Sequence, residues 1–304
     1  MRRLLLILLA LIVVLLAVNT VVTSRETKAA KADVGEIVEL PGGDLQVRDR
    51  GPAGAPAIVL LHCYTCSIHW WLDLEPLLAS DRRVVSIDLP GHGGSEKPRD
   101  GYSAEDQADL VAEALRDAGV RDALIVGQSL GGVIATALAE RHPGLVRGVV
   151  AIDAPVRERY RDLPLTARIA RAPVIGQALK RAAPDSAIRD GLADAFAEGF
   201  DVPDQFVEDV RRMTFSSFKN VPEEVDAYLE QAPTDDRLAD TGLPLLVIYG
   251  SEDTVVTPPD QAADEFRDVP GARVVMLDGI GHTPQVEAPR RTAALIRNFD
   301  RSTP

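Results

Sequence analysis

The five-residue segment 127–131, Gly-Gln-Ser-Leu-Gly, constrains the fold of this chain more than any other feature of its sequence. It follows an apolar run at residues 123–127 and precedes a helical pattern at residues 130–141. A turn from a buried strand into a helix is so tight that the flanking positions must lack side chains, which explains the two glycines. The turn lifts the serine hydroxyl out of the sheet, and the helix N-terminus stabilises negative charge. We therefore expect Ser129 to be an exposed nucleophile.

Apolar runs bounded by turn residues recur along the chain, with helical patterns between most of them. Continuous apolar runs are typical of strands that are buried on both faces, as in a parallel sheet. The runs lie at residues 57–61, 83–88, 123–127, 146–152, 243–249 and 272–277, and the clearest helical patterns at 103–118, 130–141 and 290–299. Residues 36–40 and 45–49 additionally flank a turn, which predicts a hairpin. This order predicts an α/β fold with a mostly parallel central sheet and helices on both faces.

One connection is too long for a simple crossover. About ninety residues separate the runs that end at 152 and begin at 243, and they contain helical stretches at 165–172, 188–199 and 223–231. A structureless loop of that length is rare in a compact domain, so we expect a helical insertion. Its large apolar side chains either line a pocket or form the core of the insertion: Leu163, Ile169, Val174, Leu179, Phe196, Phe206, Phe215 and Phe218.

A serine hydroxyl is a poor nucleophile and needs a base that a third group orients. Of five histidines, His282 lies just after the last apolar run, where open α/β sheets deliver loops to the carboxyl ends of their strands. We predict that His282 is the general base. His142 ends a helical pattern before a proline and is interpreted as a cap. His92 lies in a glycine-rich turn and is interpreted as a residue that sets loop geometry.

Two aspartates compete for the role of the acid. Asp253 follows the run 243–249, and with it the chain order is Ser, Asp, His, which is the order found on this kind of sheet. Asp153 follows the run 146–152 and is the alternative acid, or it merely caps the start of the insertion. The oxyanion of the reaction should rest on two backbone N–H groups. We assign these to Leu130, next to the nucleophile, and to Tyr64, after the run 57–61.

Three further motifs show a resemblance to a known family. His62, Ser67 and Trp71 match the H-G-x-x-x-S-x-x-x-W pattern of α/β-hydrolases with a helical lid. Residues 88–95 resemble their D-x-P-G-H-G-x-S loop, and residues 281–289 are similar to their G-H-x-x-x-x-E-x-P segment. The resemblance covers roughly residues 35–300. It implies an α/β-hydrolase fold whose lid lies between the sixth and seventh core strands, in agreement with the insertion.

The family implies a reaction class and leaves the substrate open. The expected reaction is cleavage of a carboxylic ester or lactone through an acyl-enzyme, with a small apolar ester-like substrate and with no cofactor and no metal. The family also contains C–C hydrolases, perhydrolases and acyltransferases, which are the alternatives on the same fold. A membrane-tethered pseudohydrolase that binds a partner is a second alternative. The complete set of Ser129, Asp253 and His282 argues against it, because a binding module needs none of them.

The chain departs from the family pattern at Cys63, where the family usually has glycine. Cys63 and Cys66 are the only cysteines, so a disulfide framework does not stabilise the fold. The pair is interpreted as two small buried residues or as a local disulfide. Redox catalysis is disfavoured, because a thioredoxin-like motif is expected in a different sheet context. A metal site formed with His62 is less favoured still.

The N-terminal segment differs from the rest of the chain. Residues 4–18 carry no polar side chain, and the apolar character continues to residue 22. A bilayer core of about 30 Å needs roughly 20 helical residues, and a core helix would show a polar face. We expect a single-pass signal anchor. The alternative is a signal that is cleaved near the Ala-Lys-Ala triplet at 30–32, although that triplet lies far from the apolar run.

The charges beside this segment do not determine its orientation in the membrane. Arg2 and Arg3 lie on one side, and Arg25, Lys28 and Lys31 lie on the other, so the positive-inside rule does not decide. The short N-terminal overhang favours a catalytic domain outside the cytoplasm. The expected organisation is an anchor at residues 1–22, a tether at 23–34, a hydrolase core at 35–153 and 243–304, and a lid at 154–242. The net charge of −13 disfavours nucleic acid as a partner.

Overall fold

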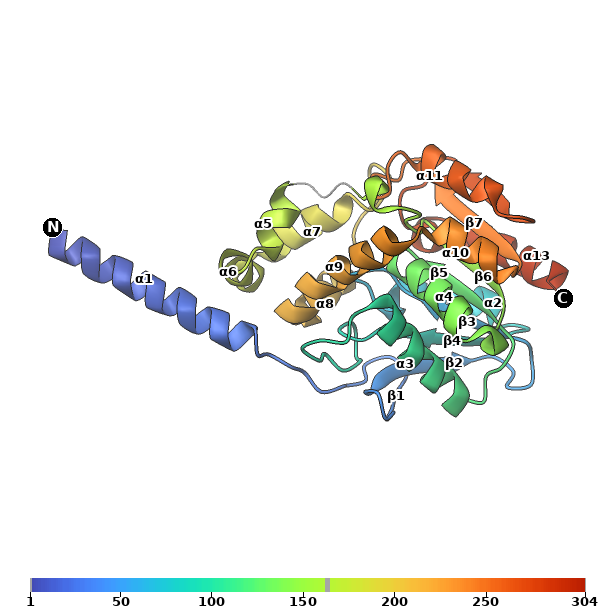
Figure 1. Cartoon of the computed structure of the whole chain (residues 1–304), viewed down its shortest axis with the longest axis horizontal. Coiled ribbons are helices and arrows are strands. Elements are labelled where there is room, and N and C mark those ends of the chain that lie inside the picture. The colour runs from blue at the N-terminus through green and yellow to red at the C-terminus, as the bar shows by residue number, and fades with distance from the viewer. Residues whose placement is uncertain (1, 162–164, 304) are drawn as a thin grey trace.

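A single eight-stranded sheet forms the centre of the molecule (Figure 1). The computed structural model describes residues 2–161 and 165–303, with side chains from 2–161 and 167–303. The strand order is β1-β2-β4-β3-β5-β6-β7-β8. Strands β3 to β8 pair in parallel, and the hairpin β1–β2 adds antiparallel pairs at one edge. The strands are β1 Glu36–Val38, β2 Leu45–Arg50, β3 Ala57–Leu61, β4 Arg83–Ile87, β5 Ala123–Gln128, β6 Val146–Ile152, β7 Leu245–Gly250 and β8 Arg273–Leu277. The predicted hairpin and the predicted mostly parallel sheet are confirmed.

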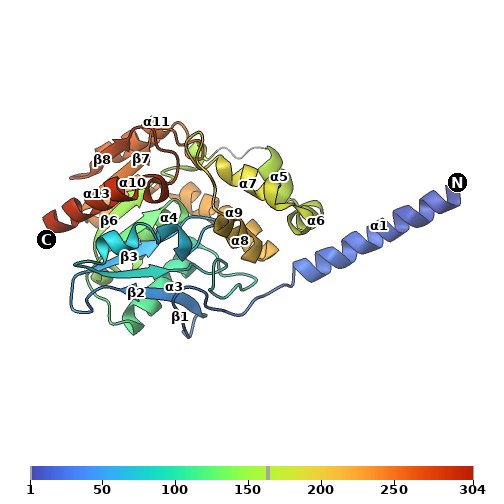
Figure 2. The ribbon, with the colours of Figure 1, turned by 180° about the vertical axis from the view of Figure 1, so that it is seen from behind.

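Helices cover both faces of the sheet (Figure 2). Helices α3 and α4 contribute to the core on one face, and α2 and α13 contribute to the core on the other. Outside the insertion the helices are α1 Arg2–Thr23, α2 Glu75–Leu78, α3 Ala104–Asp117, α4 Leu130–Arg141, α11 Pro259–Glu265, α12 Pro284–Glu287 and α13 Pro289–Ser302. Residues of β3 show why its sequence is apolar throughout, since Val59 and Leu61 join the first core and Ile58 and Leu60 the second. Burial on both faces is the reason for the continuous apolar run.

The predicted helical insertion lies between β6 and β7. Its helices are α5 Leu165–Arg171, α6 Ile175–Ala182, α7 Asp185–Ala193, α8 Asp204–Arg212, α9 Phe215–Gln231 and α10 Thr234–Thr241. The pattern at 188–199 is helical only to Ala193, because the following residues turn to meet the loop of His282. Conversely, α9 begins earlier than expected, since Thr214 caps it by accepting a hydrogen bond from the N–H of Ser217 at 3.2 Å.

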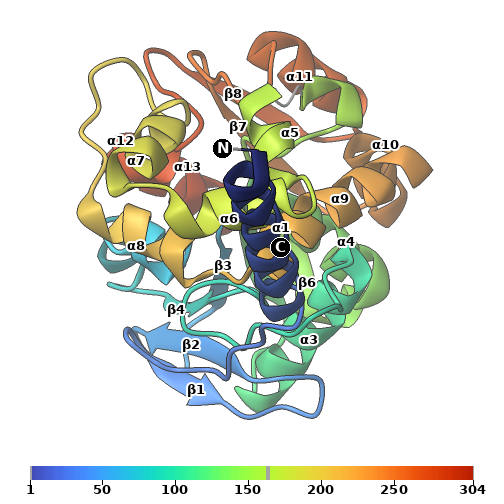
Figure 3. The same cartoon turned by 90° about the vertical axis from the view of Figure 1, so that its left-hand side faces the viewer.

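The large apolar residues of the insertion differ in exposure, and Val174 and Phe218 are half-buried. Phe196 and Phe206 are buried, and so is Phe215. Ile169 and Leu179 are exposed instead, so neither lines an interior pocket. Leu163 lies outside the described residues. The exposed pair lies on α5 and α6, the helices of the insertion nearest to α1 (Figure 3).

Helix α1 projects from the rest of the protein as an extended arm (Figure 1). At 1.5 Å per residue its 22 residues span about 33 Å. The apolar stretch of this helix is not buried against the rest of the protein. Among the described residues it is the one helix that is long and apolar enough to cross a membrane.

Candidate active site

Ser129 occupies a sharp turn between β5 and α4. Its backbone is held at φ +51°, ψ −113°, a conformation that few residues other than glycine adopt. The N–H of Ser129 donates to the carbonyl of Ile152 on the neighbouring strand β6 at 2.8 Å, and its own carbonyl accepts from the N–H of Gly132 at 2.9 Å. The serine side chain is half-buried and therefore open to a substrate, whereas its chain neighbours are buried. Strain of this kind is typical of functional positions.

The glycines around the serine are required by close backbone approach. A Cβ added to Gly127 would lie 2.1 Å from the carbonyl oxygen of Gly131. A Cβ added to Gly131 would lie 2.1 Å from the carbonyl oxygen of Leu61 on β3. Both distances are far below van der Waals contact, so the turn can form only with glycine at these positions. Close backbone approach therefore explains why glycine flanks Ser129 in the sequence.

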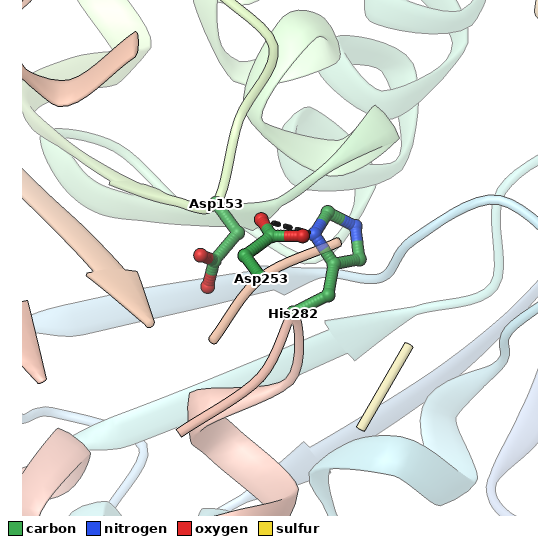
Figure 4. A group of neighbouring side chains, drawn as sticks. All are labelled: Asp153, Asp253 and His282. Atoms are coloured by element: carbon green, nitrogen blue, oxygen red, sulfur yellow. Dashed lines mark hydrogen bonds and ion pairs between the residues drawn. The ribbon is translucent and has the colours of Figure 1, made fainter. Parts of the chain in front are cut away.

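His282 and Asp253 form a buried hydrogen-bonded pair (Figure 4). Nδ1 of His282 lies 2.8 Å from Oδ2 of Asp253. The other carboxylate oxygen, Oδ1, accepts from the N–H groups of Val255 at 2.7 Å and Val256 at 3.0 Å. The carboxylate is thus fixed on both sides, and it directs the imidazole so that Nε2 is left for another partner.

Four hydrogen bonds hold the loop of His282 in place beside the serine turn and the insertion. The side-chain amide of Gln128, next to Ser129, donates to the carbonyl of His282 at 2.7 Å. The N–H of His282 donates to the carbonyl of Ala195 in the insertion at 2.9 Å. Glu287 accepts from the N–H of Ala197 at 2.9 Å and from the N–H of Gly281 at 3.2 Å. The loop is therefore tied both to the nucleophile strand and to the insertion.

The backbone segments of Ser129 and His282 are connected through the hydrogen bond of Gln128. In the part of the chain that the structure describes, no hydrogen bond joins the Ser129 hydroxyl to His282. Catalytic hydrogen bonds are often long without a bound substrate and tighten in the complex. Gln128 was missed by the sequence analysis, although a polar residue at the end of a buried strand was a signal for it.

Asp153 lies beside Asp253 rather than beside the imidazole (Figure 4). Its Oδ1 accepts from the N–H of Gly250 at 2.9 Å, and its Oδ2 has no hydrogen-bond partner. Burial raises the pKa of Asp153 well above its ordinary value, and the neighbouring Asp253 carboxylate raises it further, which favours the protonated form. The ligand atoms of Asp153, Asp253 and His282 lie within 4.8 Å of one another, so among the described residues this is a group that could hold a cation. The hydrogen bond between the Asp253 carboxylate and the His282 imidazole is also the arrangement that a general base requires.

The loop after β3 carries a local disulfide. Cys63 and Cys66 are joined, with their Cα atoms 5.2 Å apart, which decides between the two interpretations of this pair. The disulfide encloses Tyr64 and Thr65, and Thr65 has a positive φ of 65°. Among the described residues, no hydrogen bond is made by the backbone N–H of Tyr64 or of Leu130. Both predicted oxyanion donors are therefore available.

Hydrogen bonds of buried polar side chains hold this loop in place. His62 donates from Nδ1 to the carbonyl of Cys63 at 2.7 Å, and its Nε2 accepts from the N–H of Leu89 at 2.9 Å. Burial lowers the pKa of His62 to about 4, so the imidazole is neutral at ordinary pH. Asp88 accepts from the N–H of Ile68 and from the N–H of Gly94, each at 2.7 Å. Burial raises the pKa of Asp88 to about 6.

His92 and His142 have structural roles. His92 is fully buried and donates from Nδ1 to the carbonyl of Pro90 at 3.0 Å, as expected for a residue that shapes its turn. His142 follows α4, and its Nε2 lies 2.8 Å from a carboxylate oxygen of Asp109. The geometry therefore singles out His282 from the histidines of the chain, because it alone among them contacts Asp253.

Residues of the insertion pack against the loop after β3. The indole of Trp70 stacks on Phe206 with ring centroids 3.9 Å apart, and both belong to a cluster that includes the disulfide. Arg171, the last residue of α5, places its guanidinium carbon 5.3 Å from the centroid of the Tyr64 ring. The Tyr64 hydroxyl donates to the carbonyl of Phe218 on α9 at 2.5 Å. Tyr64 is therefore the residue where the core meets the insertion.

The strand–turn–helix serine and the buried imidazole–carboxylate pair define a class of protein, the α/β hydrolases. Residues 56–289 match the family of the alpha/beta hydrolase fold, and the chain belongs to this family. A pimeloyl-[acyl-carrier protein] methyl ester esterase from Aromatoleum aromaticum is 33% identical over 263 residues, which cover 81% of this chain and 98% of the esterase.

Solved structures share the fold. An enol-lactonase from Burkholderia xenovorans LB400 has a TM-score of 0.72 and 22% identity, and the match covers 88% of this chain and all of the lactonase. A membrane phospholipase A described as a bacterial virulence factor also has a TM-score of 0.72, with 24% identity over 100% of this chain and 99% of its own. At these identities the likeness shows the fold alone. The chain is a member of a hydrolase family, and the relatives that it resembles include esterases.

Proposed function

We propose that this protein is a serine hydrolase in which Ser129 is the nucleophile, His282 the general base and Asp253 the acid that orients it. The observation that carries the proposal is the buried pair of His282 and Asp253, 2.8 Å apart, held beside the strained serine turn by Gln128. In this proposal Ser129 Oγ attacks a carbonyl carbon while His282 takes its proton. The same proton then passes to the leaving alcohol, and water releases the acyl group by the reverse sequence.

The oxyanion is proposed to rest on the N–H groups of Tyr64 and Leu130. Leu130 is the first residue of α4, so the helix dipole adds to its hydrogen bond. Tyr64 is held between two disulfide-bonded cysteines, which restricts the position of its N–H. Preorganised donors of this kind supply a large share of the rate enhancement in acyl transfer.

The proposed substrates are carboxylic esters or lactones with an apolar acyl group. Support comes from the esterase that is 33% identical to this chain. The proposed lid is the insertion, residues 154–242, between the two parts of the core at 35–153 and 243–304. No cofactor or metal takes part in the proposed chemistry. Perhydrolysis, C–C cleavage and acyl transfer on the same fold are distinguished by product analysis with a substrate panel.

The test of the nucleophile is labelling with a fluorophosphonate probe. Wild-type protein should be labelled, and Ser129→Ala should not be labelled and should lose several orders of magnitude in kcat while keeping its thermal unfolding profile. Retained labelling of Ser129→Ala would exclude Ser129 from the mechanism. A folded wild-type protein that is not labelled and hydrolyses no ester would instead favour the non-catalytic binding protein.

We further propose that α1 anchors the protein in a membrane, with the catalytic domain outside the cytoplasm and with residues 23–34 as a tether. The exposed apolar surface of α1 supports the anchor, because apolar area in water costs about 25 cal/mol per Å². The Cys63–Cys66 disulfide supports the location, since disulfides persist in oxidising compartments.

The test of the anchor and its orientation is protease treatment of intact cells followed by fractionation. We expect the catalytic domain to be cut in intact cells and to fractionate with membranes. A domain that is cut only after lysis would contradict the orientation. A soluble mature protein that begins near Asp33 would identify the segment as a cleaved signal.

A further inference from the structure

Exposed apolar side chains outside α1 gather on one part of the insertion. Among the described residues beyond α1, four large hydrophobic side chains are exposed: Ile169 (42%), Ile175 (57%), Leu179 (46%) and Val255 (36%). The first three lie on α5 and α6, and we call them the α5–α6 apolar face. Ile175 and Leu179 are four residues apart on α6, so they point to the same side of the helix.

This face lies next to the end of α1. Helix α6 packs against α1, and Arg181 donates to the side-chain oxygen of Asn19 at 3.3 Å. Viewed from the side of α1, the helices α5 and α6 are the nearest parts of the catalytic body (Figure 3). A bilayer that surrounds α1 would therefore meet the catalytic body first at the α5–α6 apolar face.

The local charge fits an anionic surface. Residues 163–184 contain no acidic residue, in a chain whose net charge is −13. Their basic residues Arg168 and Arg181 are exposed, whereas Arg171 and Lys180 contact the Tyr64 ring and the carbonyl of Met213. Apolar side chains bordered by arginine and lysine are typical of segments that lie in the interface of a bilayer with anionic lipids. The rest of the protein, being acidic, would be repelled by the same surface.

The same segment reaches the candidate active site. Arg171 ends α5, two residues after the exposed Ile169, and its guanidinium lies over the ring of Tyr64. Tyr64 is the proposed oxyanion donor. The helix that carries the exposed Ile169 therefore also contacts the residue whose N–H is the proposed oxyanion donor.

We propose that the α5–α6 apolar face lies in the lipid interface of the membrane that holds α1, and that substrates enter from that interface. The substrate class is an amphiphilic ester whose acyl chain remains in the bilayer while its carbonyl reaches Ser129. The choice of substrate rests on the proposed hydrolase function and on the anchoring role of α1. The occupant of the face is the lipid bilayer, because the face continues the apolar surface of α1 and carries the complementary charge.

The first test measures contact with lipid and needs no activity. The full chain with Ile175→Cys is labelled with an environment-sensitive fluorophore and reconstituted in phosphatidylcholine–phosphatidylglycerol vesicles; both native cysteines are in the disulfide, so the label is specific. The matched control carries Arg290→Cys, an exposed residue on α13, a helix outside the insertion. Brominated acyl chains should quench the label at 175 and leave the label at 290 unchanged, and aqueous iodide should do the reverse.

Two outcomes of this test would overturn the proposal. One is quenching at 175 by iodide to the same extent as at 290, which would mean a face open to water. The other is protection from both quenchers together with energy transfer between differently labelled copies, which would mean that a second copy of the chain covers the face. Both outcomes are readable even if the protein hydrolyses no ester.

The second test separates substrate delivery from chemistry. Ile175→Gln combined with Leu179→Gln should raise the apparent KM for a long-chain ester embedded in the vesicles by about tenfold. Turnover of water-soluble p-nitrophenyl acetate should be unchanged. The control, Arg290→Gln with Arg291→Gln, changes two exposed residues of α13 and should leave both activities unchanged. Equal effects on the embedded and the soluble ester would overturn the proposal, whereas loss of both activities in wild type would refute the hydrolase function instead.

Discussion

Replacing each aspartate near His282 by asparagine tests which carboxylate orients the base. In Asp253→Asn the amide oxygen should occupy the position of Oδ1, because Val255 and Val256 both donate N–H groups there. The amide NH₂ then faces Nδ1 of His282 across the present 2.8 Å contact. A donor in that position forces the imidazole proton onto Nε2, so the ring can no longer accept the proton of Ser129.

The expected cost for Asp253→Asn is therefore that of a wrong tautomer. In another serine hydrolase this change lowers kcat on the order of 10⁴, which is about 5 kcal/mol of transition-state stabilisation. Asp153→Asn should cost less than about tenfold. Its carboxyl group is already driven to the neutral form by burial and by Asp253, and asparagine keeps the acceptor for the N–H of Gly250.

The assay is steady-state hydrolysis of a short p-nitrophenyl ester, with fluorophosphonate labelling as a second measure of nucleophilicity. Thermal unfolding followed by circular dichroism controls for misfolding in both variants. A larger loss of kcat in Asp153→Asn than in Asp253→Asn, with both variants folded, would refute the reasoning and would assign the acid to the end of β6.

Three further outcomes are expected. Gly131→Ala should lower the melting temperature sharply or prevent folding, because its Cβ would lie 2.1 Å from a carbonyl oxygen of β3, whereas Gly144→Ala, which meets no atom within 4 Å, should not. The folded pKa of His62, about 4, lies below the unfolded value of 6.5, so this residue lowers the stability of the wild-type protein as the pH falls between these values. His62→Gln should remove that contribution, which is about 1.4 kcal/mol per pH unit. Urea unfolding at several pH values measures the difference in slope. Reduction of the Cys63–Cys66 disulfide should lower kcat several-fold with little change in KM, as measured with and without a phosphine reductant, because it frees the proposed oxyanion loop.

Local constraints on the chain allowed much of the fold to be predicted from the sequence. The parallel strands were predicted to within about two residues, because most of them are buried on both faces and are therefore apolar at nearly every position. The serine turn was predicted because Gly127 satisfies a steric requirement that acts over four residues, whereas the requirement at Gly131 comes from the carbonyl of Leu61 on β3. The positions of His282 and Asp253 followed from the rule that the carboxyl ends of parallel strands meet at one edge.

Contacts between distant segments were decided only by the tertiary structure. Asp153 and Asp253 end neighbouring strands and look alike in the sequence, and only the packed loops show that Asp253 contacts the imidazole while Asp153 is held by Gly250. The disulfide was one of two open interpretations, since spacing alone does not fix whether two thiols approach.

The exposure of apolar side chains was decided in the same way. Leu179 and Phe196 are both large hydrophobic residues of helical segments in the insertion, yet one is exposed and the other buried. Periodicity predicts which residues share a helix face, but the direction of that face depends on how six helices pack over the sheet and beside α1. The sequence determined the sheet through its continuous apolar runs and the serine turn through its glycines, and the tertiary packing decided which apolar face of the insertion remains open beside the proposed anchor.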